Sequence, residues 1–180
     1  LIRAGNDASD IPLIARSRDN NTTYLKVNGT GNIGIGTSPI ATHTSYRSLT
    51  LGGLTTIQTD TGTSAGGFVG LTHNAHIDTD NSWEYIITDE ASFYQQKNGE
   101  HRFFTAGSGT AGNDITWSQK VTISNGGNVG IGTTSPSSKL EIAFSRSTTL
   151  PITYDVTDAQ SAAPYTDELV IKNTANNEVG

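Results

Sequence analysis

The chain lacks two residue types altogether: among its 180 residues there is no cysteine and no methionine. The absence of cysteine excludes disulfide bonds and thiolate metal sites. Because position 1 is not methionine either, we expect the sequence to be a piece of a longer or processed chain. No apolar run approaches the roughly 18 residues of a transmembrane helix, so we expect no membrane insertion.

Charge and apolar content are both low. The formal net charge is −6 and the isoelectric point is about 5.0, with no basic cluster, which argues against nucleic-acid binding. Hydrophobic residues make up only 33% of the chain. So small a net charge does not prevent folding, but the core of each chain should be thin. Such chains often complete their core against copies of themselves.

The abundant residues are those that form strands and turns. Threonine and isoleucine stiffen strands, whereas glycine, asparagine and serine favour turns. No window shows the apolar periodicity of a long helix; the best helical candidate, Asp158–Ala163, is short and is stopped by Pro164. The sequence therefore predicts an all-β fold.

Two stretches, ninety-six residues apart, are nearly identical, and we call them the motif segments. Val27–Thr37 reads VNGTGNIGIGT and Ile123–Thr133 reads ISNGGNVGIGT, and a Ser-Pro pair follows each of them. An internal repeat indicates that one supersecondary unit is copied along an axis. This pattern favours an architectural role over catalysis.

Apolar residues alternate with glycine and polar residues in both motif segments, which predicts half-buried strands after tight turns at 29–31 and 125–127. The apolar face would carry Val27, Ile33, Ile35, Ile123, Val129 and Ile131. Glycines on the other face weaken an isolated strand. We therefore expect a close backbone approach or a positive φ at Gly34, Gly36, Gly130 and Gly132.

Aromatic residues are concentrated between the motif segments. Residues 66–120 hold both tryptophans and four of the five phenylalanines, which predicts a small β module with a core of Trp83, Trp117 and either Phe103 or Phe104. Its expected strands are Phe68–Thr72, Ser82–Thr88, Ser92–Gln96 and His101–Thr105, with turns at 89–90 and 97–99.

The resulting division of the chain has six parts. They are a first shaft repeat (1–53), a linker (54–65), the aromatic module (66–120), a second shaft repeat (121–142), a second linker (143–166) and the start of a further repeat (167–180).

The second motif segment resembles the shaft repeats of bacteriophage tail fibres. The resemblance lies in GNVGIGTTSP at Gly127–Pro136, followed by KLEI at Lys139–Ile142. The upstream sequence is similar to a module that precedes such repeats in those proteins. The residues concerned are Gly70–Ala75, Trp83, Tyr85, Thr88, Ala91–Gln95 and Gly107–Ile115. The resemblance covers most of residues 66–142 and, more weakly, residues 24–51.

This resemblance implies an elongated, parallel homotrimeric fibre located in a virion, with repeated glycine-rich β shaft segments and a small intervening β-sheet module. The six apolar residues of the motif segments would then point toward the threefold axis. The implied partners are copies of the chain, other virion proteins and a host-surface glycan or receptor. The implied function is to hold and position host-receptor-binding regions during attachment.

Motifs for other chemistry are weak. Gly31–Gly36 looks like a dinucleotide-binding loop, but no helix follows it. His73 and His76 would face opposite sides of a strand, so they could not share a metal ion without a bend. Asp78–Asn81 begins like a calcium loop but lacks its glycine and its distal glutamate. We expect no cofactor, no metal site and no catalytic residue, and therefore not an enzyme.

Two alternative functions stay open for the aromatic module. It could itself bind a glycan or receptor, with contacts from Tyr94 and from the turn residues Asp78, Asp80, Asn81, Lys97 and Asn98. Less favoured is a polysaccharide depolymerase, because the module also contains several carboxylates, Glu84 among them.

Overall fold

The computed structural model describes residues 13–63 and 65–143, which form strands, turns and loops with no helix. The prediction of an all-β fold is confirmed for this part of the chain. The strands are β1 (Leu13–Arg16), β2 (Thr23–Val27), β3 (Ile33–Ile35), β4 (Tyr46–Leu51), β5 (Thr55–Asp60), β6 (Phe68–His73), β7 (Ala75–Ile77), β8 (Trp83–Tyr85), β9 (Asp89–Lys97), β10 (Glu100–Gly109), β11 (Ser118–Ile123), β12 (Val129–Ile131) and β13 (Leu140–Ile142).

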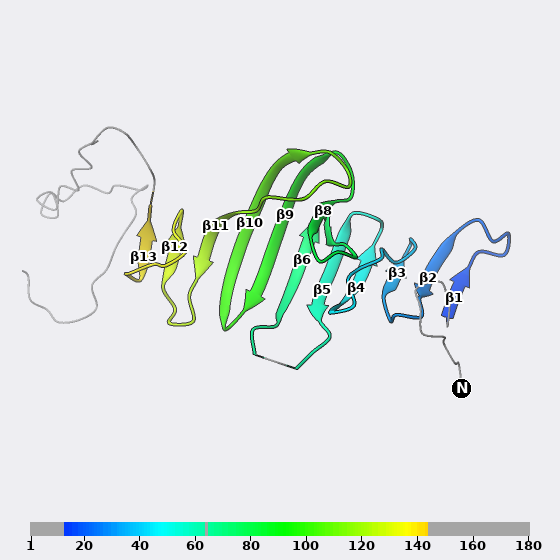
Figure 1. The fold of residues 1–180 in the computed structure, drawn as a ribbon, viewed down its shortest axis with the longest axis horizontal. Helices are drawn as coiled ribbons and strands as arrows, with labels where there is room; N and C mark the ends of the chain where they lie inside the picture. Colours follow the sequence, from blue (N-terminus) through cyan, green and yellow to red (C-terminus); the bar gives the residue numbers. More distant parts are fainter. Residues whose placement is uncertain (1–12, 64, 144–180) are drawn as a thin grey trace, which may run out of the picture. The chain divides into compact units, whose positions relative to one another are not determined.

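Eleven of these strands form one mixed sheet (Figure 1), in the order β1-β2-β3-β4-β5-β6-β9-β10-β11-β12-β13. Neighbouring strands are antiparallel except for two parallel pairs, β3 with β4 and β12 with β13. The order follows the sequence with one interruption, where β7 and β8 leave the sheet as a separate two-stranded hairpin. Most connections are therefore short, and the sheet grows strand by strand along the chain.

The two motif segments form the same arrangement of three strands. In each, a hairpin pairs the strand before the turn with the strand after it, as Val27 with Ile33 and Ile123 with Val129. The strand after the turn then pairs in parallel with a strand beyond the Ser-Pro pair. A tight turn therefore separates the alternating residues of the first motif segment into two strands. In this turn Gly31 has a φ of 84°, and its amide donates to the Asn28 carbonyl at 2.9 Å.

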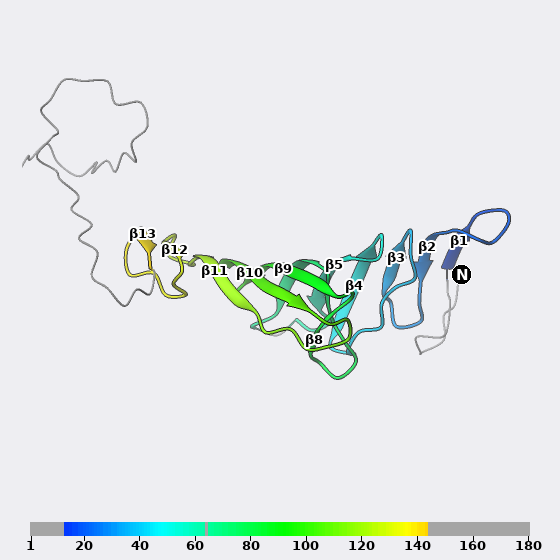
Figure 2. The same cartoon turned by 90° about the horizontal axis from the view of Figure 1, so that it is seen from above.

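The β7–β8 hairpin lies on one face of the sheet (Figure 2) and is held there by hydrogen bonds. The hydroxyls of Thr56 in β5 and Thr72 in β6 donate to the Ala75 carbonyl at 3.0 and 2.6 Å. The Gln58 side-chain oxygen accepts from the Ile77 amide at 3.2 Å. Hydrogen bonds of this kind let the buried polar side chains of β5 and β6 support a covering hairpin.

Asn74 joins the hairpin to the sheet at the point where the chain leaves β6. Its side chain is fully buried, and its φ of 56° lies in the left-handed region. The side-chain amide donates to the carbonyls of Ile87 and Glu90 at 3.1 and 3.0 Å, and its oxygen accepts from the Ile87 amide at 2.8 Å. Asparagine tolerates this backbone conformation better than most residues, which explains its use at the bend.

An aromatic cluster fills the space between the hairpin and the central strands. The ring of Phe93 in β9 lies 4.7 Å from that of Trp83 and 5.2 Å from that of Phe104. Trp117 packs at the edge of Trp83, with a centroid distance of 5.8 Å. Of the two phenylalanines proposed for this core, Phe104 belongs to it. Phe103 lies on the opposite face and is 42% exposed.

Three expectations from the sequence are corrected by the strand assignments. Residues 54–65 were expected as a linker, but they contain β5, which pairs with β4 and β6. A turn was expected at 89–90, but β9 begins at Asp89. The aromatic module does not have a sheet of its own, because β6, β9 and β10 continue the sheet of the motif segments. The further repeat at 167–180 and nearly all of the linker at 143–166 lie outside the described residues.

Candidate functional site

One row of apolar residues crosses the sheet from its first strand to its last, and we call it the apolar row. It has one member in each of the eleven strands, and every member is the direct register partner of the next. The members are Leu13, Val27, Ile33, Leu49, Ile57, Leu71, Tyr94, Phe103, Val121, Ile131 and Ile142. Residues paired in this way stand on the same face of a sheet, so the row is a continuous stripe.

The face that carries the apolar row is not covered by the described residues. Nine large hydrophobic side chains on this face are between 36% (Ile57) and 53% (Ile142) exposed. They are Leu13, Ile35, Ile57, Val69, Leu71, Phe103, Ile131, Leu140 and Ile142. Monomeric proteins seldom expose so long a stretch of contiguous apolar surface, and such a surface marks an interaction site.

Two flanking rows, one on each side of the apolar row, complete what we call the apolar face. One runs through Ala15, Leu25, Ile35, Leu51, Thr55, His73 and Ser92, and the other through Arg47, Thr59, Val69, Gln96, His101, Ile123, Val129 and Leu140. The first is apolar in β1–β4 and the second in β11–β13. In the middle strands their members are polar apart from Val69, and the polar ones are Thr55, His73, Ser92, Thr59, Gln96 and His101. Among the members of the three rows, the only arginine, lysine or carboxylate is Arg47. The apolar face is therefore a narrow, almost uncharged stripe in the middle strands and a broader one at the ends.

The six residues proposed from the motif segments all lie on this face. Val27, Ile33 and Ile131 belong to the apolar row, and Ile35, Ile123 and Val129 belong to the flanking rows. Sequence reasoning missed the central members, among them Ile57, Leu71 and Phe103. The signal was present in β6, where Val69 and Leu71 alternate with glycine and threonine.

The motif glycines lie where the chain folds back over the other face. A Cβ atom added at Gly34 would collide with the backbone of Thr37 and would lie 2.7 Å from the Pro39 nitrogen. At Gly130 it would lie 2.8 Å from the Thr133 carbonyl oxygen. Gly36 and Gly132 have positive φ values of 71° and 77°. The backbone that approaches Gly34 and Gly130 is thus the chain's own segment leading into the Ser-Pro pair.

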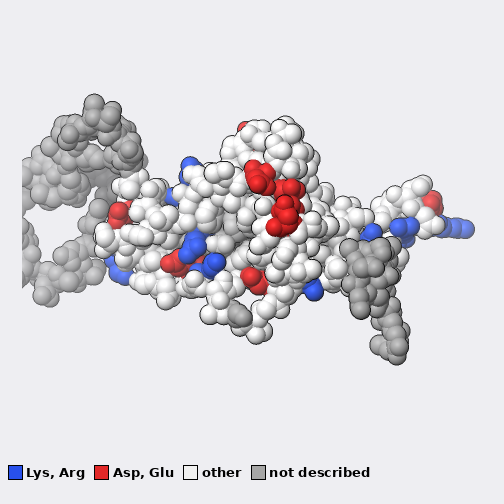
Figure 3. Space-filling model, viewed as in Figure 1, with Lys and Arg blue, Asp and Glu red and all other residues white. Residues whose placement is uncertain are grey.

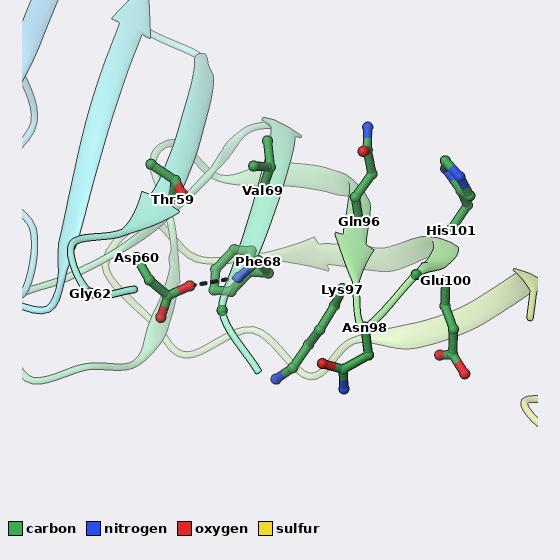
Figure 4. A pocket seen from close by; sticks show the side chains of 12 residues that line it. Thr59, Asp60, Gly62, Phe68, Val69, Gln96, Lys97, Asn98, Glu100 and His101 are labelled. Carbon is green, nitrogen blue, oxygen red and sulfur yellow. Dashed lines mark hydrogen bonds between the residues drawn. The ribbon is translucent and has the colours of Figure 1, made fainter. Parts of the chain in front are cut away.

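The proposed receptor-contact residues do not form one site. Asp78, Asp80 and Asn81 lie at the tip of the β7–β8 hairpin. Lys97 and Asn98 line a polar groove of about 390 Å³ between the turn after β5 and the turn after β9 (Figure 4). Tyr94 lies in the apolar row, beside a hollow of about 420 Å³. The hairpin tip is therefore separate from the other two, whereas the groove adjoins the apolar face, because Val69, Gln96 and His101 of one flanking row also line it.

The acidic residues of the hairpin gather on the covered side of the sheet (Figure 3). Burial raises the pKa of Glu84, and the nearby charges of Asp78, Asp80 and Asp114 raise it further. Burial also lowers the pKa of His76, whose Nε2 lies 3.8 Å from the Glu84 carboxylate. A neutral His76 does not offset the negative charge around Glu84. The cluster therefore carries unrelieved repulsion at neutral pH.

Asp78 is held differently from Glu84. Partial burial opposes its ionisation, but hydrogen bonds from the backbone amides of Ser82 and Asp80 outweigh this effect and lower its pKa. Its carboxylate closes the turn at the hairpin tip. Within the described residues, no group of three or more histidines and carboxylates is arranged to hold a metal ion.

In residues 13–63 and 65–143, no helix has the length and apolar character needed to cross a membrane.

No family model and no curated protein matches this chain.

We predict that Glu84→Gln raises the melting temperature (Tm) at neutral pH. Because the pKa of Glu84 is raised in the folded chain, its ionised form destabilises folding, and a neutral amide removes this effect. The gain should vanish below the ordinary pKa of 4.5, where the carboxyl is protonated in both states. Thermal melts at several pH values measure it, with exposed Glu90→Gln as the control. An unchanged or lower Tm at neutral pH would contradict the prediction.

We predict that Gly130→Val destabilises the fold by about 1–3 kcal/mol, because the new side chain would overlap the Thr133 backbone. Gly126→Val is the matched control in the same hairpin. A Cβ atom at Gly126 would meet only the Ser124 hydroxyl, at 3.9 Å. Chemical denaturation of both variants measures the difference, and equal stabilities would show that the close approach at Gly130 is relieved at no cost.

Proposed function

We propose that this chain is a structural segment of a homotrimeric virion fibre of the bacteriophage tail-fibre type. In this role it holds and positions host-receptor-binding regions for attachment. The observation that carries the proposal is the apolar row, whose eleven members stand in direct register on a face that the described residues leave uncovered. The resemblance of the motif segments to tail-fibre shaft repeats supports the class of protein.

The nearly uncharged character of the apolar face favours a copy of the chain as its partner. Around a symmetry axis, identical residues from different copies come close together. A charge on this face would therefore meet the same charge from another copy. Only Arg47 carries a fixed charge among the three rows, and it stands in a flanking row near the lower-numbered end of β4.

The size of the apolar face is sufficient for a stable assembly. Eleven strands spaced about 4.8 Å apart give a row about 50 Å long. Three rows of alternate residues, about 7 Å apart, give a footprint of roughly 700–1,000 Å² per chain. A stable interface buries about 800 Å² per partner. Association through this face would therefore bury an area of the size found in stable interfaces.

The width of the apolar stripe favours three copies over two. A face-to-face pair of sheets would bury all three rows, including the polar flanking residues Thr59, Gln96 and His73 of the middle strands. Three sheets around an axis would bring only the central row to the axis. Their flanking rows would contact the neighbouring sheets at the rim of the interface, where polar side chains can reach water or one another.

We predict that the unmodified chain has a mass in light scattering of three times its 19.0 kDa, and that Ile131→Asp dissociates it. The substitution would place three like charges at one level of the apolar row, in an apolar environment. Thr134→Asp, at an exposed loop position a few residues away, is the control and should leave the trimer intact. A folded monomer for the unmodified chain would contradict the proposal.

The two alternative functions have a separate test. As a structural segment, the assembled chain should neither bind glycans on an array nor release reducing sugars from host polysaccharides. Glycan binding that is lost in a Lys97→Ala, Asn98→Ala variant would instead assign receptor recognition to the polar groove. Sugar release would assign a depolymerase activity.

A further inference from the structure

A regular apolar row creates a problem of alignment for copies that assemble through it. Ten of its eleven members have no polar side-chain atom, and they recur once per strand. If one copy shifts along the row by one strand, about 4.8 Å, aliphatic residues still face aliphatic residues almost everywhere. Apolar contacts alone therefore discriminate poorly between registers, as in other repetitive interfaces.

One feature of the apolar face breaks this regularity. Tyr94 is the only member of the row with a hydroxyl, and this hydroxyl lies 2.5 Å from Nδ1 of His101 in the next strand. The two rings are stacked, with centroids 6.0 Å apart and planes 18° apart. Both side chains are only partly buried in the single chain. When the Tyr94 hydroxyl donates to Nδ1, the proton of the imidazole is on Nε2, which is then a donor.

The surroundings of this pair are apolar along the row and polar across it. Along the row, Tyr94 is followed by Phe103, whose ring centroid is 4.9 Å away, and is preceded by Leu71. Across the row, Gln96 pairs with His101 and Ser92 stands beside Tyr94 on the same strand. On its own two strands the pair is thus flanked by polar side chains, whereas the members of the row on either side of it are apolar.

We propose that the Tyr94–His101 pair sets the axial register of the assembled copies; this inference rests on the proposed trimer. In register, the pairs of all copies lie at one level, where hydroxyl, imidazole and amide groups can satisfy one another. After a shift by one strand, each pair faces the aliphatic or aromatic neighbour of another copy's pair. The Tyr94 hydroxyl keeps its His101 partner in any register, but the imidazole Nε2 then faces apolar side chains, and this loss of a polar partner opposes the shift. A single polar position sets the register of coiled coils in the same way.

The absence of cysteine from the chain allows a direct measurement of register. Leu49→Cys and Ile57→Cys place thiols at adjacent members of the apolar row. Chains of the two variants, carrying different affinity tags, are refolded together and oxidised. A disulfide requires Cβ atoms about 4 Å apart, so like pairs form preferentially in register. Unlike pairs increase when copies are displaced by one strand, and the ratio of unlike to like pairs reports the displacement.

The register pair is tested by adding Tyr94→Phe, and separately His101→Leu, to both cysteine chains. We expect each to keep the trimer mass in light scattering and to raise the ratio of unlike to like disulfides severalfold. Tyr24→Phe removes a hydroxyl from an exposed tyrosine on the other face and should leave the ratio unchanged.

Three results would overturn the inference, and they are distinguishable. An unchanged ratio in intact trimers would show that register is set elsewhere and would leave the proposed function standing. Dissociation of the Tyr94→Phe trimer would show that the pair holds the copies together rather than aligning them. A monomeric parent chain would remove the proposed trimer itself, and the register pair with it.

Discussion

Polar and large aliphatic side chains are divided unusually between the two faces of one sheet, and the rest of the structure depends on this division. The face covered by the chain itself carries the aromatic cluster near its middle and is otherwise lined by small and polar residues such as Thr56, Gln58 and Thr122, which are fully buried. These are satisfied by hydrogen bonds, whose net contribution to stability is modest, about 1 kcal/mol each. Large aliphatic side chains stand mainly on the other face. Much of the free energy available from apolar burial, about 25 cal/mol per Å², can therefore be gained only when that face is covered.

The same division explains the composition of the motif segments. A segment leading into a Ser-Pro pair covers each hairpin so closely that only glycine fits at Gly34 and Gly130. Such a thin layer buries almost no apolar surface on its own side. The alternating isoleucine and valine residues can therefore contribute only toward the apolar face. One three-stranded unit thus supplies both the covering segment and neighbouring members of the apolar row.

The sequence predicted the local pattern well and the long-range continuity poorly. Alternation placed Ile33, Ile35 and Ile131 on one face because it depends only on neighbours in the chain. The central members of the apolar row depend on which strands pair. Here β6 pairs with β9, although β7 and β8 lie between them in the sequence. The linker expected at 54–65 failed for a related reason. In β5, Ile57 is the only aliphatic residue, because its covered face uses threonine and glutamine to bind the β7–β8 hairpin. A polar strand of this kind resembles a loop when read alone.

The continuity of the apolar row is not a by-product of regular pairing. The row crosses antiparallel pairs, two parallel pairs and the step from β6 to β9, and these connections have different hydrogen-bond patterns and loop lengths. It also meets a bulge between Phe103 and Phe104, where one extra residue of β11 could have exchanged its faces. The bulge lies just beyond the register pair of Phe103 and Val121, so both side chains stay in the apolar row. An uninterrupted line of apolar residues through so varied a backbone is explained most simply by a requirement on that face itself, which is the requirement that association between copies would impose.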